Sequence, residues 1–181
     1  MKKIISIFVI SAISLTLIAC GDKKQEQNTS KDSVSQTTEN KQNEEKIYKQ
    51  GETAIIKNQQ GQDLYSLTIN NVKQANDFEY RSDFNGTDKE VVEVDYTYKD
   101  INTTDMKLEI HGADLQVIDN NGTVASSSDM FPKGKPEAIT KGVNCNVQAY
   151  YGLKNESNKV KIIFTSKKYR QMVTFEVPVE K

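Results

Sequence analysis

The feature that most constrains the fold is the alternation of apolar and polar residues that runs from Val92 to Lys99 in the segment Glu90 to Lys99. Every second side chain in this segment is large and apolar: Val92, Val94, Tyr96 and Tyr98. Consecutive side chains of a β-strand point to opposite faces, so this period of two predicts a strand with one buried face and Glu93 on the outer face. No segment after residue 46 carries the period of an amphipathic helix. We therefore expect an all-β fold.

The same alternation recurs through the rest of the chain. It predicts strands over 53–57, 64–73, 143–151, 160–164 and 173–179, with shorter apolar segments near 108–110 and 115–117. A slip of phase in the second of these segments indicates a bulge at Asn70 and Asn71. Turns are expected at 58–61 and 119–122, because Asn and Gly tolerate the positive φ of tight turns.

Seven or eight strands joined by hairpins predict an antiparallel β-sandwich over residues 47–181. A closed barrel is the alternative. Pro178 lies in the last strand and cannot donate a ladder hydrogen bond, which places that strand at an edge or leaves this position unpaired on one side. The proline therefore favours an open sandwich over a barrel.

The first 19 residues have the organisation of a secretory signal peptide. Lys2 and Lys3 precede an apolar run over residues 4–18, which is shorter than the ~20 residues that span a bilayer. The sequence Leu-Ile-Ala-Cys over residues 17–20 resembles the lipobox of bacterial lipoproteins. The resemblance implies cleavage before Cys20, acylation of this cysteine with chains such as palmitate, and attachment to the extracytoplasmic face of the cell membrane.

Residues 20–46 predict a disordered tether after the lipidated cysteine. This stretch holds a single aliphatic residue, Val34, so it cannot bury enough apolar surface to offset the entropy of ordering. A flexible coil of this length would hold the folded domain about 30 Å from the membrane on average.

The charge balance argues against a nucleic-acid partner. Lys2 and Lys3 are the only charged residues of the signal segment, so cleavage leaves 22 basic against 25 acidic residues. Nucleic-acid-binding proteins carry clustered basic residues instead.

Five segments of the folded part resemble a widespread bacterial domain of unknown function found in lipoproteins and secreted proteins. They are residues 51–53, 90–98, 119–122, 141–143 and 175–178. The resemblance implies an immunoglobulin-like sandwich similar to that of a secreted mycobacterial immunoprotective antigen. Members of this family usually carry Pro where Lys141 stands, which puts the local turn in question. The family has no agreed catalytic residues, so none is carried over.

Residues able to support catalysis or metal binding are few. His111 is the single histidine, and Cys145 has no partner once Cys20 is acylated. Cys145 falls on the inward phase of its strand, which predicts a small buried apolar side chain. With one His and one free Cys we expect no zinc site, no cofactor and no enzyme activity. Carboxylates are numerous, so a two-acid glycosidase stays an alternative.

Two loops are candidate binding sites. Residues 74–89 carry Phe78, Tyr80 and Phe84 among acidic residues, and residues 126–141 carry Phe131 among lysines. Exposed aromatic side chains of this kind often meet a partner. The alternatives are that these rings fold back over the end of the sandwich, that the acidic residues hold calcium, or that the two oppositely charged loops pair with each other.

Sugar binding is a further possibility because the lipid anchor would place the domain in the cell envelope. Glycan sites stack sugars on aromatic faces, and Trp is absent, which leaves Tyr80, Tyr150 and Tyr169. The sequence as a whole predicts a non-catalytic binding or interaction module whose partner is a cell-envelope or extracellular protein. An accessory domain or enzyme acting on envelope glycans and a small-ligand carrier are the alternatives.

Overall fold

The computed structural model describes residues 46–84, 86–104 and 107–181. The predictions for the signal segment, for Cys20 and for tether residues 21–45 lie outside these residues. Within the described ranges, no helix is long and apolar enough to cross a membrane.

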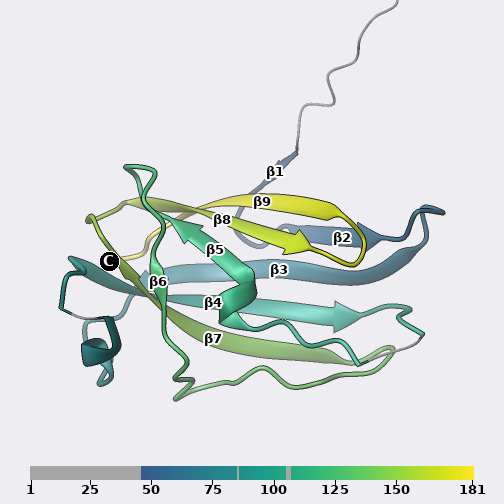
Figure 1. Cartoon of the computed structure of the whole chain (residues 1–181), viewed down its shortest axis with the longest axis horizontal. Helices are drawn as coiled ribbons and strands as arrows, with labels where there is room; N and C mark the ends of the chain where they lie inside the picture. The colour runs from purple at the N-terminus through teal and green to yellow at the C-terminus, as the bar shows by residue number, and fades with distance from the viewer. Residues whose placement is uncertain (1–45, 85, 105–106) are drawn as a thin grey trace, which may run out of the picture. The chain divides into compact units, whose positions relative to one another are not determined.

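Two β-sheets pack face to face (Figure 1). The five-stranded sheet has the order β2 (Thr53–Lys57), β3 (Asp63–Gln74), β4 (Glu90–Asp100), β7 (Asn144–Leu153) and β6 (Ser126–Ser127). The four-stranded sheet has the order β1 (Ile47–Tyr48), β9 (Gln171–Pro178), β8 (Lys159–Ser166) and β5 (Leu115–Ile118). All neighbours are antiparallel except β1 and β9. The all-β sandwich is confirmed, and two separate sheets rule out the closed barrel.

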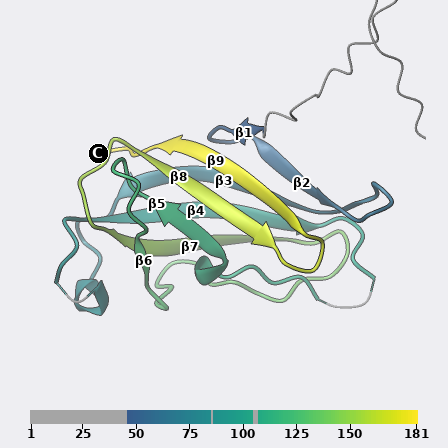
Figure 2. The same ribbon diagram turned by 45° about the horizontal axis from the view of Figure 1, so that its top comes forward.

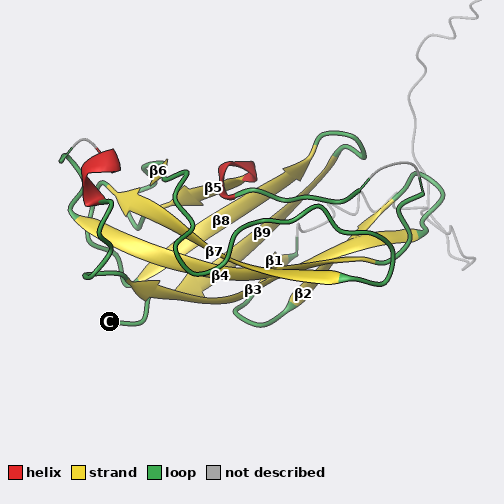
Figure 3. Cartoon of the chain, turned by 90° about the horizontal axis from the view of Figure 1, so that it is seen from below, coloured by secondary structure: helices red, strands yellow, loops and turns green. Residues whose placement is uncertain are grey.

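The helical content of the described part is limited to two short 3-10 turns (Figure 3). The first, η1 (Arg81–Phe84), lies in the loop between β3 and β4, and the second, η2 (Gly112–Asp114), leads into β5. The apolar segment at 108–110 forms no strand, because Leu108 makes only an isolated bridge to Ile139.

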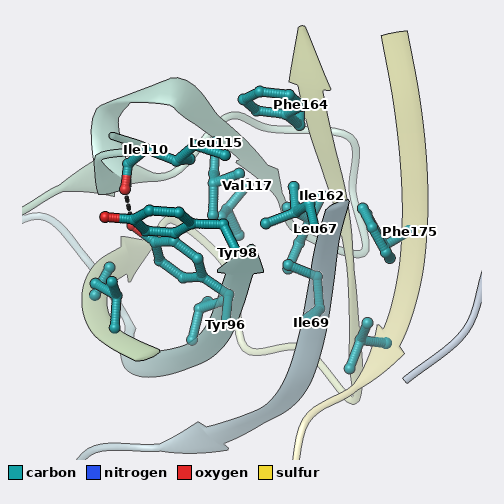
Figure 4. Packing of buried hydrophobic residues seen from close by; sticks show 14 of the residues in the cluster. Leu67, Ile69, Tyr96, Tyr98, Ile110, Leu115, Val117, Ile162, Phe164 and Phe175 are labelled. Atoms are coloured by element: carbon teal, nitrogen blue, oxygen red, sulfur yellow. Dashed lines mark hydrogen bonds between the residues drawn. The ribbon is translucent and has the colours of Figure 1, made fainter. Parts of the chain in front are cut away.

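The core lies between the sheets and is organised on β4, which occupies the centre of the larger sheet (Figure 4). Its alternating apolar side chains are all fully buried, as the sequence predicts. Buried tyrosines need a partner for the phenol group. The hydroxyl of Tyr96 donates to the carbonyl of Ile110 at 2.8 Å, and that of Tyr98 donates to the carbonyl of Glu137 at 2.6 Å.

The predicted irregularities are present. The register between β3 and β4 shifts between Ile69 and Asn71, which restores Val72 to the inner face and confirms the bulge. The turn at 119–122 closes with an N–H of Gly122 donating to the carbonyl of Asp119 at 3.0 Å. Gly122 has φ +82°, a conformation that glycine adopts without steric cost.

Short or irregular segments pair with the outer edges of β7 and β9. The outer edge of β7 is paired with the segment after β6, since Ser128 N–H donates to Tyr150 O at 2.9 Å and Gln148 N–H donates to Gly134 O at 3.0 Å. Such cover protects an edge from pairing with another chain. In the other sheet, β1 pairs only with Thr174 and Phe175, so Pro178 lies past that pairing and needs no donor there.

Candidate functional site

The outer face of the five-stranded sheet holds one buried carboxylate, Glu93, whose side chain is 2% exposed. Its oxygens lie 3.0 Å from Lys73 Nζ and 2.7 Å from Lys133 Nζ, and the hydroxyl of Tyr150 donates to it at 2.8 Å. Burial raises the pKa of Glu93, but the hydrogen bonds from these three partners outweigh that effect and hold the pKa below its usual value. The carboxylate of Glu93 is therefore a buried anion, and its ion pair with Lys133 attaches loop 126–141 to the sheet.

The other buried carboxylates are also occupied by structural partners. Glu90 binds Lys181 Nζ and accepts from the N–H of Ser157 at 2.9 Å. Asp100 accepts from the N–H of Thr103 at 2.8 Å. Asp119 accepts from the N–H groups of its own turn and from Asn155 Nδ2 at 2.7 Å, and these bonds lower its pKa although burial raises it. These acids hold turns and strand ends.

The aromatic side chains of loop 74–89 fold back over the sandwich. Phe78 is 5% exposed and Phe84 is 2% exposed, and they form a second small core with Ala75, Val91 and Tyr150. The rings of Phe78 and Tyr150 stack at 4.1 Å with an interplanar angle of 13°. Of the three candidate side chains on this loop, Tyr80 alone stays substantially exposed, at 36%.

The two candidate loops meet. Ser128 Oγ donates to Asp83 Oδ2 at 3.2 Å, but Lys133 pairs with the sheet residue Glu93 and not with an acid of loop 74–89. Phe131 is half-buried and packs against the main core beside Gly112. The two loops are thus joined by the hydroxyl of Ser128. Their charged residues pair with other segments, as Lys133 does with Glu93 and Asp88 with Lys154.

The residues considered for metal binding or catalysis lie apart. Cys145 is half-buried on the inner phase of β7 and packs against the core. His111 Nε2 lies 3.1 Å from Glu109 Oε1. In the part of the chain that the structure describes, no group of three or more His, Cys, Asp or Glu side chains is arranged to hold a metal ion.

A cleft of about 230 Å³ opens at one end of the sandwich, and we call it the end cleft. Figures 1 and 2 show the β8–β9 turn at this end, opposite the end that carries η1. The walls come from β3, from the segment before β5 and from the end of β8 with its turn. The lining residues are Tyr65, Thr103, Lys107, Leu108, Glu109, Ile110, Asp114, Phe164, Thr165, Ser166, Lys167, Lys168 and Tyr169.

The floor of the end cleft is aromatic. The Tyr65 ring meets Phe164 edge-on at 6.3 Å and Tyr169 at 6.2 Å. Burial raises the pKa of Tyr65, and a hydrogen bond with Ser166 partly opposes this rise. Lys168 Nζ lies 5.3 Å from the centre of the Tyr169 ring, within range of a cation–π interaction.

The rim of the end cleft is positively charged. Lys107 stands on one wall and Lys167 on the other, and within the described ranges neither forms an ion pair. The two carboxylates of the lining are both engaged by His111. Glu109 lies beside its imidazole, and Asp114 Oδ2 accepts from its backbone N–H at 2.8 Å.

Sequence reasoning selected one residue of this cleft, Tyr169, as a possible sugar-stacking side chain. It missed Tyr65, which reads as an ordinary strand residue, and the lysines, which read as solvated surface. The pair Lys167-Lys168 next to Tyr169 in a tight turn was the available signal.

Comparison with known proteins shows similarity at the level of fold. No protein-family model matches the chain, and no curated protein matches it. The secreted protein MPT63 of Mycobacterium tuberculosis has 12% identity and a TM-score of 0.55, over 73% of this chain and 97% of MPT63. A candidate lipoprotein of Bacillus subtilis, ycdA, has 17% identity and a TM-score of 0.50, over 64% of this chain and 36% of that protein. The matched region is thus about a third of the Bacillus protein.

Proposed function

We propose that this chain is a membrane-anchored extracytoplasmic lipoprotein whose immunoglobulin-like sandwich is a non-catalytic binding module, with the end cleft as its binding site. The end cleft is the observation that carries the proposal. It combines an aromatic floor with Lys107 and Lys167, which form no ion pair with any described residue, and such a mixture of apolar and polar groups is the usual make-up of a ligand site. This choice takes up the small-ligand alternative of the sequence analysis.

The state of the acidic residues supports a non-catalytic role. A general acid or base needs a proton that it can exchange and a path to a substrate. Glu93 and Asp119 have lowered pKa values and several hydrogen-bond donors each. Glu90 is enclosed by Lys181 and Ser157. These three groups are bound to the fold and lie outside the end cleft, whose own carboxylates, Glu109 and Asp114, are both in contact with His111.

The burial of the loop rings favours the end cleft over loop 74–89. Phe78 and Phe84 belong to the second small core, so replacing them would unfold the loop and not merely remove a contact with a ligand. Tyr80 remains as one exposed ring at the opposite end of the sandwich. Tyr80 therefore serves as the matched control for Tyr169.

The lipobox supports the anchor and the location. Two acyl chains on Cys20 would give stable attachment where one chain is marginal. Labelling cells with an alkyne analogue of palmitate should mark the wild-type protein and leave Cys20→Ser unlabelled in the soluble fraction. Equal labelling of both proteins would refute the anchor.

Hydrogen exchange on the lipidated full-length protein in nanodiscs tests the binding site. We expect a soluble digest of the cell envelope to protect peptides covering 107–110 and 164–169, and expect Tyr169→Ala to lose this protection while Tyr80→Ala keeps it. Protection confined to loop 74–89, or none at any peptide, would refute the end cleft as the site.

A further inference from the structure

We propose that the ligand of the end cleft is an anionic ring: a single sugar or aromatic ring that carries a phosphate or similar charged group. This inference rests on the proposed function, since it names the ligand class of the same site. Three properties of the end cleft support it: the volume, the aromatic floor, and the lysines on both walls.

The volume limits the ligand to one ring. About 230 Å³ corresponds to roughly seven or eight waters at ~30 Å³ each. Sites for drug-sized ligands begin at about 300 Å³. The end cleft therefore holds one ring unit, and any longer ligand would extend past the rim into solvent.

The aromatic floor of the end cleft favours a ligand that has a flat face. Tyr169 is half-buried and supplies most of the accessible ring surface, and it rests on Tyr65, which is 5% exposed and is held by Phe164 and Ser166. Aromatic side chains lose little conformational entropy on binding, and they pack well against planar or pyranose rings.

The rim selects for negative charge. Lys107 and Lys167 both line the cleft, from segments 60 residues apart in sequence, and Lys168 lies over the Tyr169 ring. Glu109 and Asp114 oppose this charge. Glu109 contacts the His111 imidazole and Asp114 accepts from the backbone N–H of His111, so the lining places three lysines against two acidic side chains. A ligand anion between the two walls would be attracted by both lysines at once.

The test uses four probes that separate ring from charge. Phenyl phosphate carries both, phenol carries the ring alone, inorganic phosphate carries the charge alone, and glucose 6-phosphate replaces the aromatic ring with a sugar. Binding to the lipidated full-length protein in zwitterionic nanodiscs is measured by ligand-observed NMR, with hydrogen exchange to locate each probe.

We expect at least one of the two phosphorylated rings to bind the end cleft tenfold or more tightly than phenol and than inorganic phosphate. Which of the two binds more tightly identifies the ring as sugar or aromatic. Raising the ionic strength from about 0.05 to about 0.5 M should weaken the phosphorylated ring and leave phenol unchanged, because exposed charges are screened.

Two sets of variants test which lysines attract the phosphate group. Lys107→Gln with Lys167→Gln should remove the tenfold preference, whereas Lys89→Gln, an exposed lysine in loop 74–89, should keep it. Equal binding of phenol and phenyl phosphate in the end cleft would overturn the anionic class and leave the proposed binding site standing. Binding of every probe outside residues 107–110 and 164–169 would overturn both.

Discussion

Removal of one hydroxyl group, in Tyr150→Phe, tests whether Glu93 is the buried anion that fastens loop 126–141 to the five-stranded sheet through Lys133. The change deletes the donor that lies 2.8 Å from Glu93 and leaves the stacking of the ring on Phe78 in place. Both lysine partners also remain. The loss is therefore that of one hydrogen bond to a buried charged group.

A hydrogen bond to a charged group contributes about 1.5–3 kcal/mol. Because Lys73 and Lys133 still neutralise the carboxylate, we expect a loss of about 2 kcal/mol in the free energy of unfolding at pH 7. For a domain of this size that corresponds to a fall in Tm of roughly 6–10 °C. Urea unfolding followed by circular dichroism measures the loss, and Tyr80→Phe is the control, because its exposed ring should change stability by less than about 0.5 kcal/mol.

The pH dependence gives a second test. The pKa of Glu93 is lowered by folding, so its contribution is complete above the unfolded value near 4.5 and disappears as the pH falls through the folded value. Burial, together with the bond to Glu93, raises the pKa of Tyr150 to about 12, so the phenol itself does not titrate in this range. The difference in stability between wild type and Tyr150→Phe should stay constant from pH 7 to 5 and shrink as the pH falls through the lowered pKa of folded Glu93. A difference that does not shrink at any pH down to acid unfolding, or that is below about 0.5 kcal/mol at pH 7, would refute the assignment.

Two further changes probe the ends of the sheets. Gly152→Ala would put a Cβ 2.6 Å from Asp88 Cγ, so we expect a loss of about 1–3 kcal/mol in urea unfolding, partly recovered by Asp88→Ala in the same chain; an unchanged midpoint would show that Asp88 moves aside freely. Lys181→Met removes the cation that binds the buried carboxylate of Glu90, so we expect a loss of about 3 kcal/mol. Adding Glu90→Gln should recover much of that loss, and an equal loss in the double variant would contradict the assignment.

The strands and turns could be predicted because their signals are local. The alternation over residues 90–99 became the central strand β4, and the phase slip at Asn70 and Asn71 became the bulge in β3. Each feature depends on neighbours a few positions apart, and the pleat of a strand converts that spacing directly into buried and outer faces.

The burial of the outer face could not be predicted in the same way. Alternation placed Glu93 opposite the core, where a charged residue is expected in water. The structure covers it with Phe78 on Tyr150 and with Lys133, which come from three separate segments. A period of two says which face a residue occupies and nothing about what later folds over that face.

The end cleft was hidden for a related reason. Its floor and rim combine Tyr65, Lys107 and the 164–169 segment, which are far apart in the sequence and meet only when the two sheets pack. The aromatic residues of loop 74–89 gave the stronger sequence signal, yet Phe78 and Phe84 are buried in the second small core. The number of aromatic residues in a loop does not tell whether their rings pack into a core or bind a ligand.

The short strand β1 determines how the domain would respond to mechanical load. A pull transmitted through the proposed membrane anchor would enter the described chain at Lys46 and would first load β1, whose backbone pairs with β9 at Thr174 and Phe175. Detachment of residues 46–49 would break this pairing, the ring contact of Tyr48 with Phe175 and the ion pair of Lys49 with Glu176, and it would lengthen the tether by about 14 Å at about 3.4 Å per residue. These few contacts would yield under tension before the long pairings of β8 with β9 and of β3 with β4, so the end cleft would stay folded.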